Sequence, residues 1–180
     1  SSLNRRVFVL EDSDFQCPFC KRVELTLEKV RKKYSNEVQF GYRHFPLPFH
    51  KEAQGLAQAV ECARDQGKFW ELQSLFYKNI SNSANDKEVL GMAKRAGIDS
   101  IRDFEFCWRN GKYAERVKND IREGIDLGIQ GTPTFILGIY DQETQTVSGE
   151  MFSGAVSEEK FVQVIEKYLS SIRTEANLSR

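Results

Sequence analysis

Two cysteines separated by two residues, in the run Cys17-Pro18-Phe19-Cys20, constrain this chain more than any other feature. The run follows the apolar segment Val7–Leu10 and precedes a helical pattern, which puts the cysteines at a strand-to-helix junction. Cysteines at this spacing can close into a small disulfide and reopen, and the free N–H groups of a helix start favour a thiolate. Pro18 suits the first helical position, where its missing N–H costs nothing. The sequence therefore predicts a redox-active dithiol.

Composition limits the remaining possibilities. Hydrophobic residues make up 40% of the 180 positions and charged residues 29%, so a packed core is expected. The 26 basic residues balance 26 acidic ones without forming a basic stripe, which argues against nucleic acid as a partner. No apolar run is long enough to span a membrane, and Ser1–Arg6 does not begin a signal peptide. We expect any signal or anchor to lie outside this sequence.

The hydrophobic pattern predicts strand, helix, strand, a long helical block, two strands and a final helix. The predicted strands cover residues 6–11, 38–45, 134–137 and 147–152, and the first helix covers 18–34. Ser157 is expected to cap the last helix, with a solvated tail over 173–180. This order is typical of an α/β, thioredoxin-like fold with an inserted α-helical subdomain. Residues 1–49 and 129–180 would form its two halves and 50–128 the insertion, in a single compact unit.

Several motifs together resemble those of the DsbA family of thiol–disulfide oxidoreductases. Glu11–Cys20 resembles the first strand, loop and dithiol of that family, and Gly131–Phe135 its cis-proline loop. Phe152–Gly154 resembles the end of its last strand. Further similarity is found in Arg43–Leu47 and Gln66–Trp70, so the resemblance covers residues 6 to about 170.

The resemblance implies roles for the dithiol residues. Cys17, at the helix N-cap and exposed, would be the nucleophile, and Cys20, one turn further on, the screened resolving cysteine. Pro18 and Phe19 would tune the redox potential. Phe19 stands where histidine is usual in the family and cannot add a positive charge beside the thiolate.

The segment around Pro133 is expected to bind substrate. The resemblance implies that the Thr132–Pro133 bond is cis and faces the dithiol, which would leave the Thr132 backbone free to pair with an extended substrate. From position alone, an ordinary trans proline opening the third strand is equally compatible.

Two acidic residues match family positions near the dithiol. Glu11 ends the first strand and Glu24 lies one turn past Cys20, where a carboxylate could relay the Cys20 proton. Glu24 could instead pair with a neighbouring lysine. His44 is expected to be a hydrogen-bonded strand residue rather than a catalytic one.

A structural zinc site is the main alternative to a dithiol. Zinc requires four ligands, usually two closely spaced pairs, and Cys62, Cys107, His44 and His50 have no such spacing. We therefore expect neither a metal nor another cofactor.

Cys62 and Cys107 lie 45 positions apart in the helical block. The resemblance favours a structural disulfide between them, because some family members carry a second bridge in the insertion. Two buried free thiols packing as small hydrophobic groups remain the alternative.

The activity that the resemblance implies is the introduction of disulfides into unfolded exported proteins by a monomeric enzyme. It would act in the periplasm or another extracytoplasmic compartment and be reoxidised by a membrane partner such as a DsbB-like protein. An isomerase or reductase is a second possibility, although no residues remain for a dimerisation domain. A third is a redox or peptide-binding module that partners a membrane protein.

Overall fold

The computed structural model describes residues 5–80 and 83–178. Its first three elements form a parallel crossover: β1 (Arg5–Ser13), α1 (Pro18–Lys33) and β2 (Val38–His44). β1 begins one residue earlier than predicted and ends two residues later, because Asp12 and Ser13 continue the ladder opposite Arg43 and His44. Asp12 also accepts two hydrogen bonds from the buried Arg43 guanidinium, at 2.6 and 2.9 Å. This ion pair fixes the end of β1 just before the dithiol.

The second part of the sheet is an antiparallel hairpin of β3 (Thr134–Asp141) and β4 (Thr146–Ser153). β3 also pairs antiparallel with β1, which gives the strand order β2-β1-β3-β4. The hairpin strands approach closely at Gly138 and Gly149, where a Cβ atom on Gly138 would lie 2.2 Å from the Ser148 carbonyl oxygen. Glycine is therefore required at this crossing point.

The block between the two parts of the sheet is helical, as predicted, and comprises α2 (Ala53–Arg64), α3 (Phe69–Asn79), α4 (Asp86–Arg95), α5 (Ile101–Arg109) and α6 (Ala114–Asp126). Asn85 caps α4 in a reciprocal capping box with Glu88. Gly97, at φ 80°, follows the end of α4, where the left-handed conformation favours glycine. Asn85 and Gly97 therefore set the two ends of α4.

The final helix, α7 (Glu158–Leu178), is longer than expected. The described side chains after residue 172 are exposed, as predicted, but the segment is helical as far as Leu178 rather than a tail, and residues 179–180 lie outside the described chain. No glycine or proline interrupts this stretch, and Arg173 binds Glu37 at 2.6 Å. The helix therefore continues past its apolar stripe.

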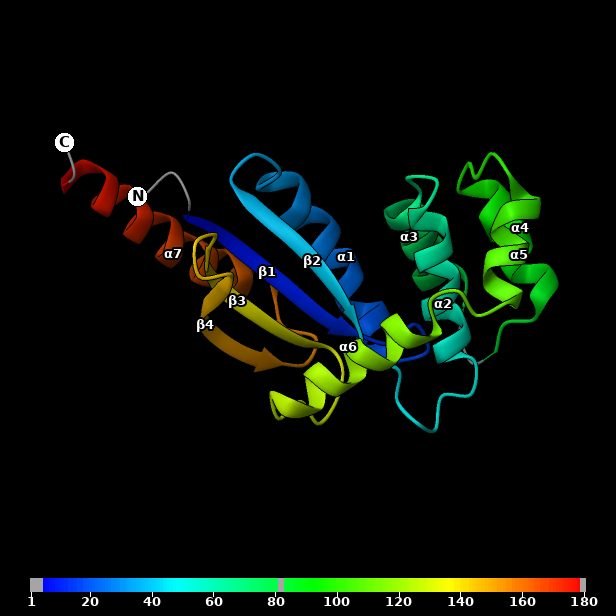
Figure 1. Ribbon diagram of the computed structural model, residues 1–180. Helices are drawn as coiled ribbons and strands as arrows, with labels where there is room; N and C mark the ends of the chain where they lie inside the picture. The colour runs from blue at the N-terminus through cyan, green and yellow to red at the C-terminus, as the bar shows by residue number, and fades with distance from the viewer. Residues whose placement is uncertain (1–4, 81–82, 179–180) are drawn as a thin grey trace.

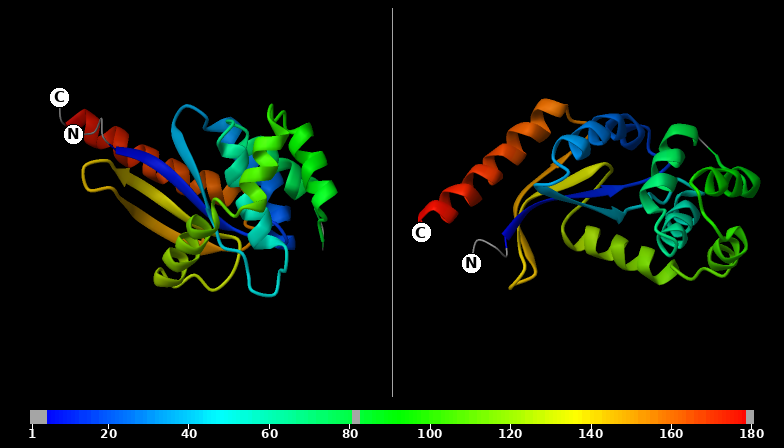
Figure 2. Two further views of the ribbon diagram at one scale, coloured as in Figure 1. Left: turned by 45° about the vertical axis from the view of Figure 1, so that its right-hand side comes forward. Right: turned by 90° about the horizontal axis from the view of Figure 1, so that it is seen from above.

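The layers of the fold are seen in Figure 2, where α1 and α7 lie on one face of the sheet and α6 on the other. Figure 1 shows α2–α5 gathered at one end of the sheet, with the end of α7 at the other. A core between the sheet, α1 and α7 includes Val9, Leu27, Phe135 and Phe161. The helical block has its own core. The arrangement confirms the α/β fold class. Within the described residues, no helix has the length and apolarity needed to cross a membrane.

A disulfide joins Cys62 of α2 to Cys107 of α5. Both residues are buried in the core of the helical block, although they lie 45 positions apart in the sequence. The bridge therefore ties two helices of the block together.

Replacing both Cys62 and Cys107 by alanine should lower the free energy of unfolding by about 2–4 kcal/mol, because the bridge no longer restricts the unfolded chain. Urea unfolding measures the change. Both proteins should carry Cys17→Ser and Cys20→Ser, so that they differ only in this pair. Equal stability of the two proteins would contradict the expectation.

Candidate redox site at the start of helix α1

The dithiol lies at the N-terminus of α1. Cys17 is the N-cap residue in an extended conformation (φ −77°, ψ 121°), and Pro18 opens the helix. A turn precedes it, in which the Cys17 N–H donates to the Asp14 carbonyl at 3.1 Å. The Lys21 N–H then donates to the Cys17 carbonyl at 3.1 Å and begins the helical ladder. The predicted strand–loop–helix geometry of the dithiol is thus present.

Cys17 is less accessible than predicted. Only 4% of its surface is exposed, and its Sγ donates to the Thr132 carbonyl oxygen at 3.3 Å. The pKa of Cys17 is nevertheless lowered to about 6. The largest cause is a hydrogen bond from Cys20; burial opposes it, and the Thr132 side chain and the backbone N–H groups of Phe19 and Cys20 lower the pKa further. The expectation of an exposed sulfur is wrong because the loop before β3 covers it.

Cys20 behaves in the opposite way. Its side chain is fully buried, and burial, followed by the nearby Cys17, raises its pKa well above the ordinary value. At neutral pH the reduced site therefore holds a thiolate at Cys17 and a thiol at Cys20. This asymmetry is the one required for a nucleophilic and a resolving cysteine.

The residues between the two cysteines face outward. Pro18 and Phe19 are both exposed, Phe19 to 50%. Arg22 lies over the Phe19 ring, with its guanidinium carbon 5.4 Å from the ring centroid. A cation therefore sits beside position 19 although the residue itself is uncharged.

The opposite wall of the site is the loop before β3. The Thr132–Pro133 peptide bond is cis in the structure, and the Pro133 carbonyl accepts from the Gly154 N–H at 2.8 Å. Thr134 anchors the same loop through its hydroxyl, which donates to the Gly131 carbonyl at 2.8 Å. The loop thus holds the Thr132 carbonyl against Cys17.

Glu11 and Glu24 lie close to one another beneath the dithiol. Both are 2% exposed, and burial, followed by the charge of Glu24, raises the pKa of Glu11 to about 8. Burial also raises the pKa of Glu24, against the opposing effect of Arg31. Glu11 is therefore a carboxylic acid at neutral pH.

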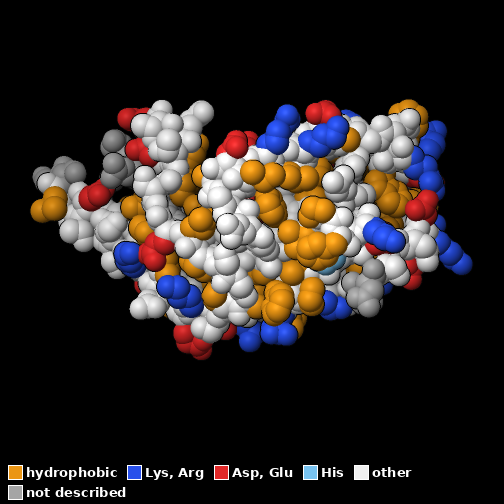
Figure 3. Space-filling model, turned by 90° about the horizontal axis from the view of Figure 1, so that it is seen from below, with side chains coloured by type: hydrophobic (Ala, Val, Ile, Leu, Met, Phe, Trp, Pro, Cys, Tyr) orange, Lys and Arg blue, Asp and Glu red, His pale blue; other side chains and the backbone are white. Residues whose placement is uncertain are grey.

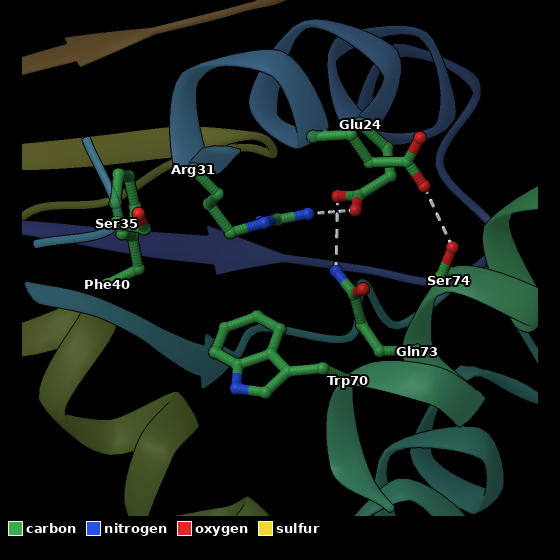
Figure 4. A pocket seen from close by; sticks show the side chains of 8 residues that line it. Glu24, Arg31, Ser35, Phe40, Trp70, Gln73 and Ser74 are labelled. Atoms are coloured by element: carbon green, nitrogen blue, oxygen red, sulfur yellow. Dashed lines mark hydrogen bonds and ion pairs between the residues drawn. The ribbon is translucent and has the colours of Figure 1, made fainter. Parts of the chain in front are cut away.

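Glu24 forms an ion pair with Arg31 rather than with a lysine, and accepts a hydrogen bond from Gln73 at 3.1 Å. Figure 4 shows these side chains around a pocket, with Trp70 on the side of Arg31 away from Glu24. The pocket has a volume of about 490 Å³. The Arg31 guanidinium lies 5.1 Å from the Trp70 ring centroid. The acidic group thus lies between α1 and the inserted α3.

His44 occupies a buried position, as expected for a hydrogen-bonded strand residue. Its Nε2 lies 2.9 Å from Glu61 of α2. Burial raises the pKa of Glu61, but hydrogen bonds from His44 and Arg64 outweigh it and lower that pKa to about 2. Within the described residues, no group of three or more histidine, cysteine or acidic side chains is arranged to hold a metal.

Sequence reasoning missed two features of the site. Asp14 is a buried carboxylate that accepts from the backbone of Gln16 and Leu47, each at 2.8 Å, and lies 2.6 Å from His50 Nδ1. It therefore holds the dithiol loop to the segment after β2. The second feature is a group of buried hydroxyls, in which the Tyr77 hydroxyl lies 2.7 Å from Ser13 Oγ and 2.6 Å from the Tyr42 hydroxyl. The predicted strand ended at Glu11, so no sequence signal pointed to Ser13.

Comparison with known proteins gives matches over most of the chain. A family model described as thioredoxin matches residues 4–167. The crystal structure of Wolbachia pipientis alpha-DsbA1 has a TM-score of 0.79 at 20% identity, covering 95% of this chain and 89% of that chain. A periplasmic thioredoxin-like protein from Salmonella enterica serovar Typhimurium has a TM-score of 0.72 at 21% identity, covering 91% and 84%.

The curated relatives are longer proteins. The Na(+)/H(+) antiporter NhaA 1 of Salinispora arenicola is 35% identical over 133 residues, which are 73% of this chain and 20% of that protein. The chain spans about a fifth of the length of the curated relatives that it matches.

Alkylation of the reduced protein should modify Cys17 first, with a rate that reaches half its maximum near pH 6, where the thiolate and thiol are equally populated. Mass spectrometry after pulses of iodoacetamide across a pH series measures this. As a control, Cys17→Ser should leave Cys20 unmodified at neutral pH. Preferential labelling of Cys20 would overturn the assignment.

Proposed function

Because the chain belongs to the thioredoxin family and has the fold of DsbA-like thiol–disulfide oxidoreductases, we propose that its Cys17–Cys20 disulfide oxidises cysteine pairs in unfolded exported proteins. The incoming substrate thiolate attacks Cys17 and forms a mixed disulfide. A second substrate thiolate then displaces Cys17, which leaves as a thiolate. The substrate gains a disulfide, and the enzyme is left with two reduced cysteines.

The unequal pKa values of the two thiols are the observation that supports this proposal. A Cys17 thiolate with a pKa of about 6 is a good leaving group, and its stability favours the reduced enzyme. A dithiol that prefers to be reduced is an oxidant of its partners. Neither group needs a cofactor for this exchange.

Exposed apolar side chains near the dithiol support binding of unfolded chains. Phe19 is 50% exposed, and Phe49, which lines a pocket together with Pro18, is 73% exposed. Figure 3 shows hydrophobic side chains gathered in the middle of the face seen from below. Exposed apolar surface of this kind is typical of sites that bind other proteins, and an unfolded client exposes apolar side chains of its own.

Turnover requires an electron acceptor, since each cycle leaves the dithiol reduced. We propose that a membrane protein that forms disulfides is this acceptor. We also propose that the protein acts in the periplasm or another extracytoplasmic compartment. The likeness to a periplasmic thioredoxin-like protein supports the location. A monomer is sufficient for this chemistry.

The direct test is oxidation of a reduced two-cysteine peptide by the oxidised protein, followed by mass spectrometry. We expect one peptide disulfide per Cys17–Cys20 disulfide, multiple turnovers with glutathione disulfide as reoxidant, and no reaction for Cys17→Ser. The variant Cys62→Ala/Cys107→Ala should remain active. If the reduced protein reduced a peptide disulfide faster than the oxidised protein oxidised the reduced peptide, the reductase or isomerase function would be favoured instead.

The antiporter relatives favour a second candidate, a redox module within a membrane protein. The chain matches about a fifth of the length of those proteins. Under this function the dithiol would exchange with cysteines of one membrane partner. Failure to oxidise unrelated peptides, with rapid exchange with that partner, would distinguish it from a general oxidase.

The stability of the reduced form relative to the oxidised form should depend on pH. The folded pKa of Cys17 is depressed to about 6, so its contribution is full above the unfolded thiol pKa of about 8.5 and is lost as the pH falls through 6. The contribution is about 1.4 kcal/mol at pH 7 and grows by about 1.4 kcal/mol per pH unit up to the unfolded value.

Urea unfolding of the reduced and oxidised proteins, at pH values between 6 and about 8.5, measures the difference in their free energies of unfolding. We expect the reduced form to be the more stable at the upper end. In the reduced protein, Cys17→Ser should remove the part of the pH dependence that comes from Cys17. An oxidised form whose advantage grows with pH would contradict the oxidase proposal.

A further inference from the structure

The side of α1 that faces away from the sheet is basic. Residues three or four positions apart share one side of a helix, and the exposed positions of α1 at this spacing carry cations around a leucine. Leu25 is 62% exposed. Figure 2 shows α1 on the outside of the sheet. We call the following residues the basic face: Lys21, Arg22, Leu25, Lys29, Lys32 and Lys33.

The acidic residues of α1 lie on another side of the helix, toward α3. Glu24 is buried and accepts a hydrogen bond from Gln73 of α3, and Glu28 binds Lys78 of α3 at 2.7 Å. In the sequence, these two acids interrupt the cations, and no basic stripe is visible. Within α1, which the structure describes completely, both acids are turned toward α3 and none belongs to the basic face.

The basic face does not stabilise the helix that carries it. Lys21 and Arg22 lie in the first turn, where a positive charge is unfavourable next to the helix dipole. Lys29 lies three and four positions before Lys32 and Lys33, and like charges at these spacings repel each other. At the margin of the face, Glu158 of α7 lies 4.0 Å from Lys29, and both side chains are well exposed. A role in binding an anionic partner would explain these unfavourable charges.

The composition of the basic face favours a lipid surface over a protein as that partner. Four of its five cations are lysines, and lysine is depleted at protein–protein interfaces, where arginine is enriched. Lysine clusters beside exposed apolar side chains are typical of surfaces that bind anionic phospholipids. Leu25 supplies an apolar side chain within the face, and Phe19 supplies another at its dithiol end.

We propose that the basic face of α1 binds the surface of a membrane that contains anionic phospholipids. The lysines contact the lipid phosphates, and Leu25 lies among the headgroups. This inference goes beyond the proposed dithiol exchange, because binding requires neither cysteine of the dithiol. Cys17 directly precedes α1, so a protein bound in this way holds its dithiol close to the membrane surface. A membrane protein that reoxidises the dithiol would be found at the same surface.

The experiment is flotation of the full chain with lipid vesicles on a density gradient. The protein should float with vesicles of equal parts phosphatidylglycerol and phosphatidylcholine, and should stay at the bottom with vesicles of phosphatidylcholine alone. Binding should weaken as sodium chloride is added, because salt screens the attraction between exposed charges. Equal binding to both kinds of vesicle, or none to either, would overturn the proposal and, in the second case, leave an acidic protein as the partner.

Matched variants test which face binds. The variant Lys29→Gln/Lys32→Gln/Lys33→Gln should lower the affinity for the phosphatidylglycerol vesicles by roughly 100-fold, because each lysine contributes about fivefold near an anionic surface.

The control removes the same charge from exposed positions of α4, in the variant Lys87→Gln/Lys94→Gln/Arg95→Gln, and should bind nearly as well as the unaltered protein. Thermal melts show that both variants are folded. An equal loss of binding in the two variants would show that net charge, and not the basic face, determines binding.

Tryptophan substitutions locate the contact directly. Leu25→Trp should add fluorescence that vesicles of brominated phosphatidylglycerol quench. Phe106→Trp places a tryptophan at an apolar position of α5 that is 71% exposed, and its added fluorescence should not be quenched. Trp70 and Trp108 of the unaltered protein give the baseline. Quenching at position 106 but not at position 25 would contradict the proposed orientation.

A last control separates this inference from the proposed function. The variant Cys17→Ser/Cys20→Ser should bind the vesicles as the unaltered protein does, although it cannot oxidise a peptide. A protein that binds the vesicles but fails to oxidise peptides would reject the proposed function and leave membrane binding standing. Loss of vesicle binding in this variant would overturn the assignment of the contact to the basic face.

Discussion

Burial of the Cys20 thiol beneath the first turn of α1 is the constraint on which the site depends. A buried sulfur resists ionisation, so the negative charge of the reduced dithiol settles on Cys17 at the helix N-cap. The backbone N–H groups of that turn help to hold the charge there. The end of β1, fixed by the ion pair between Asp12 and Arg43, positions the turn. Sheet, helix and loop thus act together to make two chemically similar cysteines unequal.

Local patterns were sufficient to predict most of the fold. The apolar run before the dithiol, the helical repeat after it and the capping residue Asn85 each act within a few positions of the chain, and the structure has the elements that they predict. The errors in the bounds of the elements have physical causes. β3 continues four residues past its predicted end because β1 and β4 both pair with it as far as Asp141. β1 continues through Asp12 and Ser13 because β2 supplies partners that a single strand cannot reveal. α7 continues to Leu178 because a polar sequence without glycine or proline does not stop a helix.

The site was predictable in its cysteines but not in their surroundings. Cys17 is covered by the Thr132 carbonyl, which is 115 positions away in the sequence. The Ser13 hydroxyl hydrogen-bonds to the Tyr77 hydroxyl, 64 positions away. No periodicity connects such residues. Glu24 was recognised as an acidic position, yet its partner Arg31 lies two turns on in the same helix and its second partner, Gln73, belongs to α3. The sequence indicated the reacting groups, and the packing of distant segments determines their pKa values.

The inserted helices therefore contribute directly to the chemistry of the site. α3 supplies Tyr77 to the hydroxyl cluster and Gln73 to Glu24, and α2 supplies Glu61 to His44 at the end of β2. Without α3, the Ser13 hydroxyl would lose its partner, and Cys20 would lose part of the core that buries it. Desolvation is the largest factor in the pKa values of both Glu11 and Cys20, and it depends on that packing. The helical block is thus part of the redox site.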